Sequence, residues 1–237
     1  MDLKSTQTVG EVAAGHPATT RLFEKLGIDY CCGGGQTLND ACKAAGLNYD
    51  TVAKSLSELV ESAPTPRQDW TTSSLADLIQ HIVTKHHEYI RSESPRLQAL
   101  AEKVVRVHGG RHPELQQVET LFSDVAHELT MHTMKEEKIL FPAIVQMEEQ
   151  GPSAMAASPF GTIQNPIRMM MMEHDSAGAA FEEMRKITAG FIAPADGCIS
   201  YRTLFQALAE FEADLHLHVH LENNILFPRA LELEGRR

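Results

Sequence analysis

One pattern occurs twice in this chain and limits the folds that it can adopt. Residues 132–142 read HTMKEEKILFP and residues 218–228 read HVHLENNILFP, so each copy has a histidine, a glutamate four residues later and then Ile-Leu-Phe-Pro. Because an α-helix turns about 100° per residue, the histidine and the glutamate of each copy project from one helix face. The repeat therefore predicts two helices that present matching side chains to a common centre.

Four long stretches have helical periodicity and similar lengths, namely residues 72–107, 114–149, 162–190 and 197–233. Segments rich in glycine and proline separate them, and strand alternation is nowhere sustained. In the first stretch Leu75, Leu78 and Ile82 follow the spacing of one buried stripe. We therefore predict an all-α protein whose main part is an antiparallel four-helix bundle, a fold whose core can hold metals.

A small helical domain is expected before the bundle. Residues 1–62 contain short helical patterns around the segment DYCCGGGQ, and Thr37 with Asp40 resembles a capping box at the start of a helix. The segment SAPTPRQDW then interrupts the periodicity with two prolines. We predict a linker over residues 63–71 and the four-helix bundle over residues 72–237.

The composition argues against several classes of protein. The chain of 237 residues has a formal net charge of -11, so no strong positive field attracts nucleic acid or an anionic membrane surface. The apolar runs fall far short of the roughly 20 residues that span a bilayer, and the amino terminus lacks the apolar stretch of a signal peptide. Four cysteines do not make a secreted disulfide scaffold. We expect a cytoplasmic protein without nucleic-acid or membrane partners.

The repeat also selects particular histidines from the 12 in the chain. The shared ILFP tails align the two copies at an offset of 86 residues, which pairs His132 with His218 and Glu136 with Glu222. The alignment thereby chooses His218 over the other histidines beside it. Each copy then contributes one imidazole and one carboxylate from a single helix face.

Two related hairpins would each bring a further histidine from their first helix. In the second copy His174 lies 44 residues before His218. In the first copy His87 lies 45 residues before His132, and His86 lies 46 residues before it. The spacing favours His87, although His86 lies nearer the centre of the apolar stripe, so both stay candidates on this ground.

Four imidazoles and two carboxylates converging from four helices indicate a metal site. Six ligands are too many for one tetrahedral zinc, and the mixture of imidazole and carboxylate suits iron or manganese better than copper or calcium. Two ions fit the set better than one, with the carboxylates as bridges and open positions left for a small ligand. A single histidine on a helix is more often an ordinary surface or core residue. An aligned repeat is harder to explain by packing, because buried carboxylates without partners are costly.

The adjacent Cys31 and Cys32 lie between Tyr30 and three glycines. A zinc knuckle is not expected, since neither Cys42 nor Cys198 supplies a second pair with the required spacing. The two cysteines could form a strained vicinal disulfide, or present exposed thiolates near a helix start that lowers the thiol pKa. The remaining alternative is two small buried residues at a tight turn.

These residues resemble those of the hemerythrin-like di-iron proteins, and most closely the branch called repair of iron centres (RIC) proteins, which repair iron-sulfur clusters. That branch has an amino-terminal DYCCGG motif, present here at residues 29–34, and a linker tryptophan, here Trp70. Its bundle has segments similar to residues 132–142 and to HVHLENNILFPRAL at 218–231. The resemblance covers nearly the whole chain, with its motifs in the same order.

The resemblance implies a non-haem di-iron centre, with two iron ions and oxo and carboxylate bridges. Its ligands fall on His87, His132, Glu136, His174, His218 and Glu222. Pro95, eight residues after His87, matches the family pattern and selects His87 over His86. Oxygen-carrying hemerythrins use a further histidine and an aspartate in the last helix, so Glu222 argues against a dedicated oxygen carrier. The chain departs from the pattern at His86, where an aromatic residue is usual, and in the run MMMM at 169–172, which leaves the site intact.

Other roles follow only from the resemblance. Glu128 and Glu173 match acidic residues near the family's site, where they could relay protons or guide iron, with solvated helix carboxylates as the alternative. Cys31 and Cys32 are expected to have a redox or thiol-transfer role.

The function implied is the repair of iron-sulfur clusters damaged by nitrosative or oxidative stress. Repair could proceed by iron delivery, by nitric oxide reduction, which is oxidoreductase-type chemistry, or by both. The partners are then damaged iron-sulfur proteins, nitric oxide or oxygen as small ligands, and a second copy of the chain in a homodimer. The alternatives are an oxygen or redox sensor and binding module, or a plain helical bundle whose histidines bind nothing.

Overall fold

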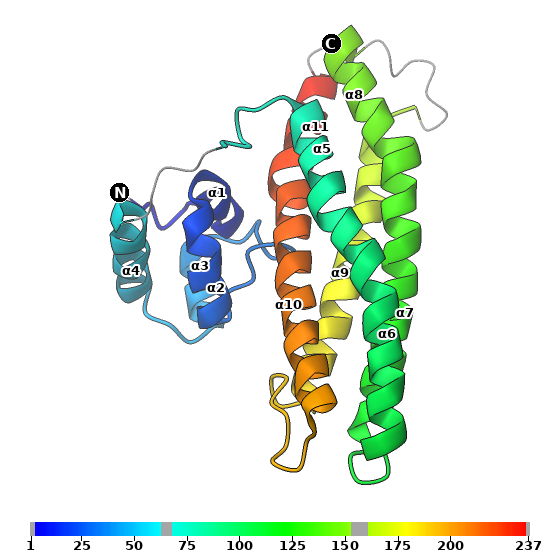
Figure 1. Cartoon of the computed structure of the whole chain (residues 1–237). Coiled ribbons are helices and arrows are strands. Elements are labelled where there is room, and N and C mark those ends of the chain that lie inside the picture. Colours follow the sequence, from blue (N-terminus) through cyan, green and yellow to red (C-terminus); the bar gives the residue numbers. More distant parts are fainter. Residues whose placement is uncertain (1–2, 63–67, 153–160, 236–237) are drawn as a thin grey trace. The chain divides into compact units, whose positions relative to one another are not determined.

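The structure is a computed structural model that describes residues 3–62, 68–152 and 161–235 (Figure 1). These residues are predominantly helical and contain no β-strand; their only strand-like pairing is an isolated bridge between Thr8 and Thr37. The prediction of an all-α fold is therefore confirmed. Of the predicted linker at 63–71, only residues 68–71 lie within the described ranges.

The chain divides into two compact units. Unit 1 consists of Met1–Ile79, Ile144–Ile163 and His216–Arg237. Unit 2 consists of Gln80–Ala143 and Gln164–Leu215. The units therefore combine segments that are distant in the sequence.

Short helices make up the amino-terminal part of unit 1: α1 (Val9–Gly15), the 3-10 helix η1 (Pro17–Thr19), α2 (Thr20–Leu26), α3 (Leu38–Ala44) and α4 (Tyr49–Ser62). Thr8 and Glu11 form a capping box at the start of α1, and Thr37 caps α3 by accepting the Asp40 N–H at 3.2 Å, at the predicted position. Helices of seven residues are too short to be stable alone in water, so packing must hold them.

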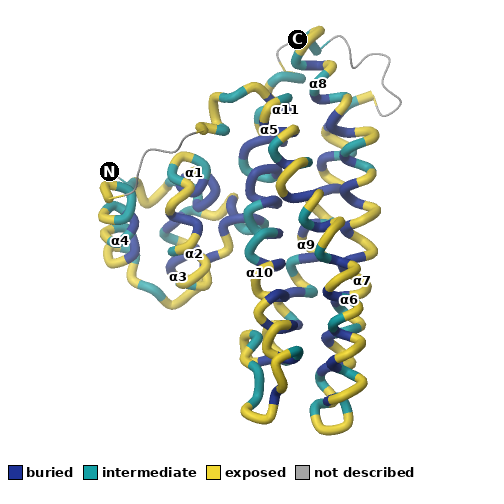
Figure 2. The backbone as a smooth tube through the Cα atoms, in the orientation of Figure 1, coloured by how far each residue is buried: buried dark blue, intermediate teal, exposed yellow. Residues whose placement is uncertain are grey.

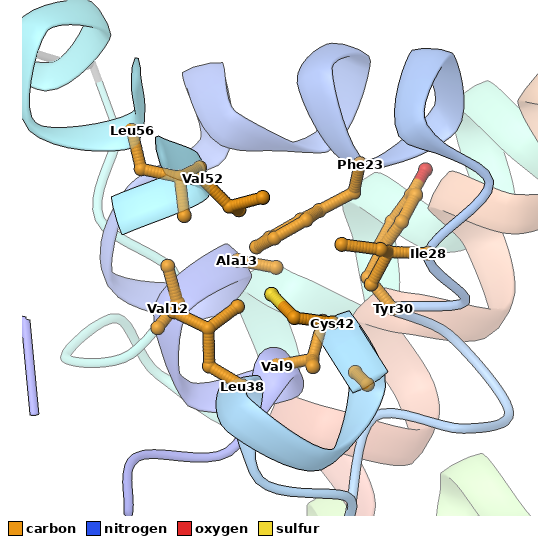
Figure 3. Packing of buried hydrophobic residues seen from close by; sticks show 11 residues of the cluster. Val9, Val12, Ala13, Phe23, Ile28, Tyr30, Leu38, Cys42, Val52 and Leu56 are labelled. Atoms are coloured by element: carbon orange, nitrogen blue, oxygen red, sulfur yellow. The ribbon is translucent and has the colours of Figure 1, made fainter. Parts of the chain in front are cut away.

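A small hydrophobic core supplies that packing (Figure 3). The rings of Phe23 and Tyr30 stack with centroids 6.2 Å apart, and the Tyr30 hydroxyl donates to Glu24 at 2.9 Å. Residues from α1, α3 and α4 and from the loop after α2 complete the core: Val9, Val12, Ala13, Ile28, Leu38, Ala41, Cys42, Val52 and Leu56. Cys42 is thus a packing residue, and burial raises the pKa of its thiol.

The four predicted long stretches are helical, and the expected four-helix bundle is confirmed. The first is α5 (Leu75–Ile82), η2 (Val83–His87) and α6 (Glu88–His108), and the second is α7 (Glu114–Lys135), η3 (Glu136–Leu140) and α8 (Phe141–Gln150). The third is α9 (Gln164–Ile187), and the fourth is α10 (Ile199–Leu221), η5 (Glu222–Leu226) and α11 (Phe227–Gly235). None of the helices in the described ranges has the length and hydropathy needed to cross a bilayer.

Within unit 2, α7 packs against both α6 and α9. Buried residues recur along each of these helices (dark blue in Figure 2), as expected for amphipathic helices that share a core. Phe122 of α7, Phe181 of α9 and Phe211 of α10 form an aromatic cluster with centroids 5.4 to 6.4 Å apart. An ion pair between Arg185 and Glu212 further ties α9 to α10.

Three of the helical rods contain a five-residue π-helical segment, at η2, η3 and η5. In η3 and η5 the N–H groups of Phe141 and Phe227 bond the carbonyls of Glu136 and Glu222, five residues earlier. Pro142 and Pro228 follow directly, and a proline has no N–H and clashes with the carbonyl four residues before it. A widened turn relieves that clash. Such turns occur often at functional sites.

Candidate metal centre

The six residues expected to bind metal are all buried, with exposed fractions of 0% or 1%. His87 ends η2, and Glu136 and Glu222 begin η3 and η5, so three of the six lie in the widened turns. The other three lie on long helices, namely His132 on α7, His174 on α9 and His218 on α10.

These side chains make up two overlapping groups. His87, Glu136, His218 and Glu222 form one group, and His132, Glu136, His174 and Glu222 form the other. Within each group one ligand atom from every residue lies within 4.8 Å of the others. Glu136 and Glu222 belong to both groups, and a carboxylate shared in this way can bridge two ions.

The geometry around Glu136 fits a cation. Its Oε2 lies 3.4 Å from His87 Nε2 and 3.3 Å from His132 Nε2, and His132 Nε2 lies 3.0 Å from His174 Nε2. Neither Glu136 oxygen has a hydrogen-bond partner among the described residues. A desolvated carboxylate in that position is costly unless a cation neutralises it. The donor set of nitrogen and oxygen atoms suits iron.

Two carboxylates outside the groups orient the imidazoles. Glu137 lies 2.8 Å from His87 Nδ1, and Glu173 lies 2.8 Å from His132 Nδ1. A carboxylate at Nδ1 fixes the proton there, so Nδ1 donates and Nε2 keeps its lone pair for a metal. Metal-binding histidines commonly have this arrangement.

Both orienting carboxylates stay ionised at neutral pH. Burial alone would raise the pKa of Glu173, but hydrogen bonds from Lys135 and His132 outweigh it and lower that pKa below its usual value. The pKa of Glu137 is lowered in the same way, because hydrogen bonds from Arg91 and His87 outweigh the effect of burial. Each carboxylate therefore favours a proton on the imidazole that it faces.

The second copy of the repeat has a different neighbourhood. His218 Nε2 lies 3.0 Å from Glu222 Oε1. Burial lowers the pKa of the adjacent His220 to about 4, against the opposing effect of a hydrogen bond to the Tyr30 backbone. The ring of Tyr30 lies edge-on to His220 at 5.4 Å and to His216 at 6.4 Å. The two histidines that the repeat did not select are thus neighbours of the amino-terminal loop.

His86 and His87 are both buried but have different surroundings. His87 belongs to a metal-binding group and stacks on Phe141 with centroids 5.7 Å apart. His86 Nδ1 instead lies 3.0 Å from Asp214, and His86 belongs to neither group. The structure therefore brings His87, and not its neighbour, to the other candidate ligands.

The two acidic residues expected near the site differ. Glu173 is half-buried and contacts His132, whereas Glu128 is exposed on α7, as a solvated carboxylate would be. Sequence reasoning missed Glu137 and Asp214. Their positions offered a weak indication: Glu137 directly follows a ligand, as Glu173 directly precedes one, and Asp214 lies one helical turn before His218.

Asp29 organises the loop that carries the paired cysteines. Its Oδ1 accepts the N–H groups of Cys31 at 2.9 Å and Cys32 at 3.1 Å, and its Oδ2 accepts the Gly33 N–H at 2.8 Å. An aspartate that bonds the backbone two to four residues ahead stabilises a tight turn. The Asp29 of the DYCCGG motif therefore has a structural role.

All four cysteines are free thiols, with Cys31 buried and Cys32 half-buried. A hydrogen bond with Cys32, burial and the negative charge of Asp29 all raise the pKa of the Cys31 thiol. The alternative of an exposed thiolate with a lowered pKa therefore does not describe Cys31.

Comparison with known proteins gives two family matches in order along the chain. Residues 5–60 match the family described as Domain of Unknown function (DUF542), and residues 78–230 match the Hemerythrin HHE cation binding domain. The second match contains all six buried candidate ligands.

Full-length relatives give the same result. A probable iron-sulfur cluster repair protein of Haemophilus influenzae is 41% identical over 95% of this chain and 96% of its own length. The iron-sulfur cluster repair protein YtfE of Pectobacterium carotovorum is 40% identical over 96% of this chain and 98% of its own, and YtfE of Yersinia pseudotuberculosis is 37% identical over 99% and 100%. The chain therefore belongs to the family of iron-sulfur cluster repair proteins that carry a hemerythrin HHE cation binding domain.

Proposed function

We propose that the chain repairs iron-sulfur clusters damaged by nitrosative or oxidative stress, and that it does so with a non-haem di-iron centre. The observation that carries the proposal is the pair of buried His/Glu groups that share Glu136 and Glu222. The names of the relatives supply the reaction class. The proposed ligands are His87, His132, Glu136, His174, His218 and Glu222.

Each part of the chain has a defined task in this proposal. Glu136 and Glu222 would hold iron together with the four histidines, and Glu137 and Glu173 keep Nε2 of His87 and His132 available to bind it. Iron held there would supply electron transfer and the capacity to bind nitric oxide or oxygen. The buried surroundings exclude water, which strengthens the electrostatic contacts that hold the ligands.

Iron delivery and nitric oxide reduction both remain part of the proposal. The side chains of Glu137 and Glu173 are 28% and 31% exposed, so each joins a buried imidazole to solvent. Metal binding requires deprotonated ligands and therefore releases protons. These carboxylates offer a route by which the protons leave as iron enters and return as it departs.

The alternative function is an oxygen or redox sensor. One contact favours it: Asn224 of η5, two residues after Glu222, hydrogen-bonds the backbone of the cysteine loop. A change at the metal could reach the amino-terminal part of unit 1 through that contact. We further predict an amino-terminal domain over residues 1–62, a linker over 63–71 and the bundle over 72–237. A cytoplasmic location and a homodimer are also predicted.

Metal analysis with a matched pair of variants tests the proposal. We expect the protein from iron-replete cells to contain about two irons per chain, as a two-metal site requires. His87→Ala should lose iron, whereas His86→Ala should keep it, because His86 faces Asp214. Added to an enzyme with a nitric-oxide-damaged cluster, the iron-loaded protein should restore activity under reducing conditions. Iron binding without restored activity would instead support the sensor, and an absence of iron would contradict both functions.

A further inference from the structure

The side chain of Asn224 joins a metal-binding segment to the cysteine loop, and both belong to unit 1. We propose that Asn224 is a positioning residue that seats residues 30–34 on η5, so that metal occupancy at Glu222 controls access to Cys31. The inference rests on the proposed di-iron function and adds to it a coupling between metal and thiols.

Three acceptors surround the Asn224 amide nitrogen. Nδ2 lies 3.1 Å from the Tyr30 carbonyl, 3.2 Å from the Cys31 carbonyl and 3.1 Å from His220 Nδ1. Only the amide nitrogen can donate to the two carbonyls, which fixes the orientation of the side chain. The contact therefore holds the backbone on both sides of the Tyr30–Cys31 peptide bond.

His220 supports the same arrangement. It hydrogen-bonds the Tyr30 backbone, and its Nδ1 lies 3.1 Å from Asn224 Nδ2. The rings of Tyr30 and His220 also lie edge-on, with centroids 5.4 Å apart. His220 and Asn224 therefore both contact the loop at Tyr30.

Two glycines make room for the Asn224 side chain. A Cβ added at Gly10 would lie 2.3 Å from Asn224 Oδ1, and one added at Gly34 would lie 2.4 Å from the same atom. Gly10 also donates its N–H to the Gly34 carbonyl at 2.8 Å, which joins α1 to the loop around the amide. Gly34 of the DYCCGG motif therefore has a steric role at this contact.

The seated loop covers one thiol more than the other. Cys31, whose carbonyl accepts from Asn224, is 6% exposed, whereas Cys32 is half-buried. Release of the Asn224 contact frees the backbone at Tyr30 and Cys31 and lets the Cys31 sulfur reach solvent. Asn224 thus controls how often that thiol can react.

The same side chain depends on the metal ligand. Asn224 lies in the π segment that begins at Glu222, so a metal held by Glu222 restrains the turn from which Asn224 projects. Coupling between two sites is reciprocal in free energy, so loop seating must strengthen metal binding as much as metal strengthens seating.

Alkylation of Cys31 by iodoacetamide, followed by peptide mass spectrometry, measures this coupling. In the parent protein, iron loading should slow alkylation by about fivefold or more, the usual lower range for coupled sites. In Asn224→Ala the rate should rise by about five- to thirtyfold, as expected for the loss of one or two net hydrogen bonds, and the ratio of metal-free to iron-loaded rates should approach one. Asn224→Asp keeps the size but cannot donate, and should behave in the same way.

A second experiment tests the Asn224 contact by changing Gly10, which packs against the amide. Gly10→Ala should accelerate alkylation in the parent, because its Cβ displaces the Asn224 amide. In the Asn224→Ala background the same change should have a smaller effect, limited to the 3.0 Å approach of the added Cβ to the Gly34 carbonyl. Gly15→Ala, on the same helix α1 and with nothing within 4 Å of its added Cβ, should leave the rate unchanged in both backgrounds.

The outcomes separate this inference from the proposed function. Unchanged alkylation rates in Asn224→Ala and Asn224→Asp, or equal effects of Gly10→Ala in both backgrounds, would overturn the role of Asn224 even if iron binds normally. An iron effect on alkylation that persists in both Asn224 variants would overturn the coupling. Failure of the protein to bind iron would instead overturn the di-iron proposal.

Discussion

The two copies of the repeat have the same buried ligands but different outer neighbours. Around the first copy, the half-buried carboxylates of Glu137 and Glu173 contact the imidazoles of His87 and His132. Glu137 also pairs with Arg91, and Glu173 with Lys135. In the second copy the residues beyond Glu222 are amides, and Asn224 turns toward the cysteine loop. The buried His/Glu pattern is therefore repeated, whereas the residues around it are not.

The difference assigns separate tasks to the two copies. The charged neighbours of the first copy tune its imidazoles and link them to solvent. The neutral neighbours of the second copy link the site to another part of its own unit.

The largest effect is expected from Glu136→Leu and Glu222→Leu. Each removes one shared carboxylate, so each should reduce iron well below two per chain and make the rest easier to extract with a chelator. Metal bound only to the native state contributes about 4 kcal/mol at a thousandfold excess over its dissociation constant, and the variants should lose most of it. Calorimetry should give melting temperatures near that of the metal-free parent. If Glu222→Leu alone kept both ions, the two copies would not be equivalent.

An intermediate effect is expected from Glu137→Ala and Glu173→Ala. Loss of a carboxylate that orients a metal-binding histidine typically reduces metal affinity about 10- to 100-fold. Chelator competition should show that reduction, with two irons still bound at saturation. Glu128→Ala is the matched control, because Glu128 is exposed on the same helix as His132. An equal loss of affinity in the control would show that general charge, rather than orientation, holds the iron.

The smallest effect on iron is expected from the double change Cys31→Ser and Cys32→Ser. Asn224 contacts backbone carbonyls and not the sulfur atoms, so the seat of the loop should persist. Iron content and absorption spectrum should therefore match the parent, while repair of a damaged cluster should fall. Full repair activity in this variant would make the cysteines ordinary turn residues.

The helices could be predicted from the sequence because their apolar residues recur with helical periodicity. The six candidate ligands could be predicted because they lie at matching positions of a repeat. The HxxxE spacing is set by the helix itself, and the ILFP tails gave the alignment that selected His218. The repeat alone did not distinguish His86 from His87, because they are adjacent. The choice of His87 required the match of Pro95 to the family pattern. Those features depend on local geometry and on the repeat.

The remaining features depend on packing that periodicity does not describe. Glu137 and Asp214 contact their histidines across helices, at separations of 50 and 128 residues. Asn224 contacts Tyr30 over 194 residues, and no spacing rule joins those two positions. Two of the three π segments, η3 and η5, had a local cause in Pro142 and Pro228, but a proline inside a helical pattern indicates only some kink or break, without its form.

The widened turn at η5 also limits how this chain can change in length. Deletion of one residue within Glu222–Leu226 would convert the bond from the Phe227 N–H to the Glu222 carbonyl from a five-residue to an ordinary four-residue spacing. Phe227 and Ala230 would then stay in the core, whereas Asn224, inside the turn, would leave its contact with Gly10 and Gly34. The loop at 188–198 between α9 and α10 should absorb such deletions much better, because loops tolerate length changes. The extra residue of the widened turn is therefore what gives Asn224 its position.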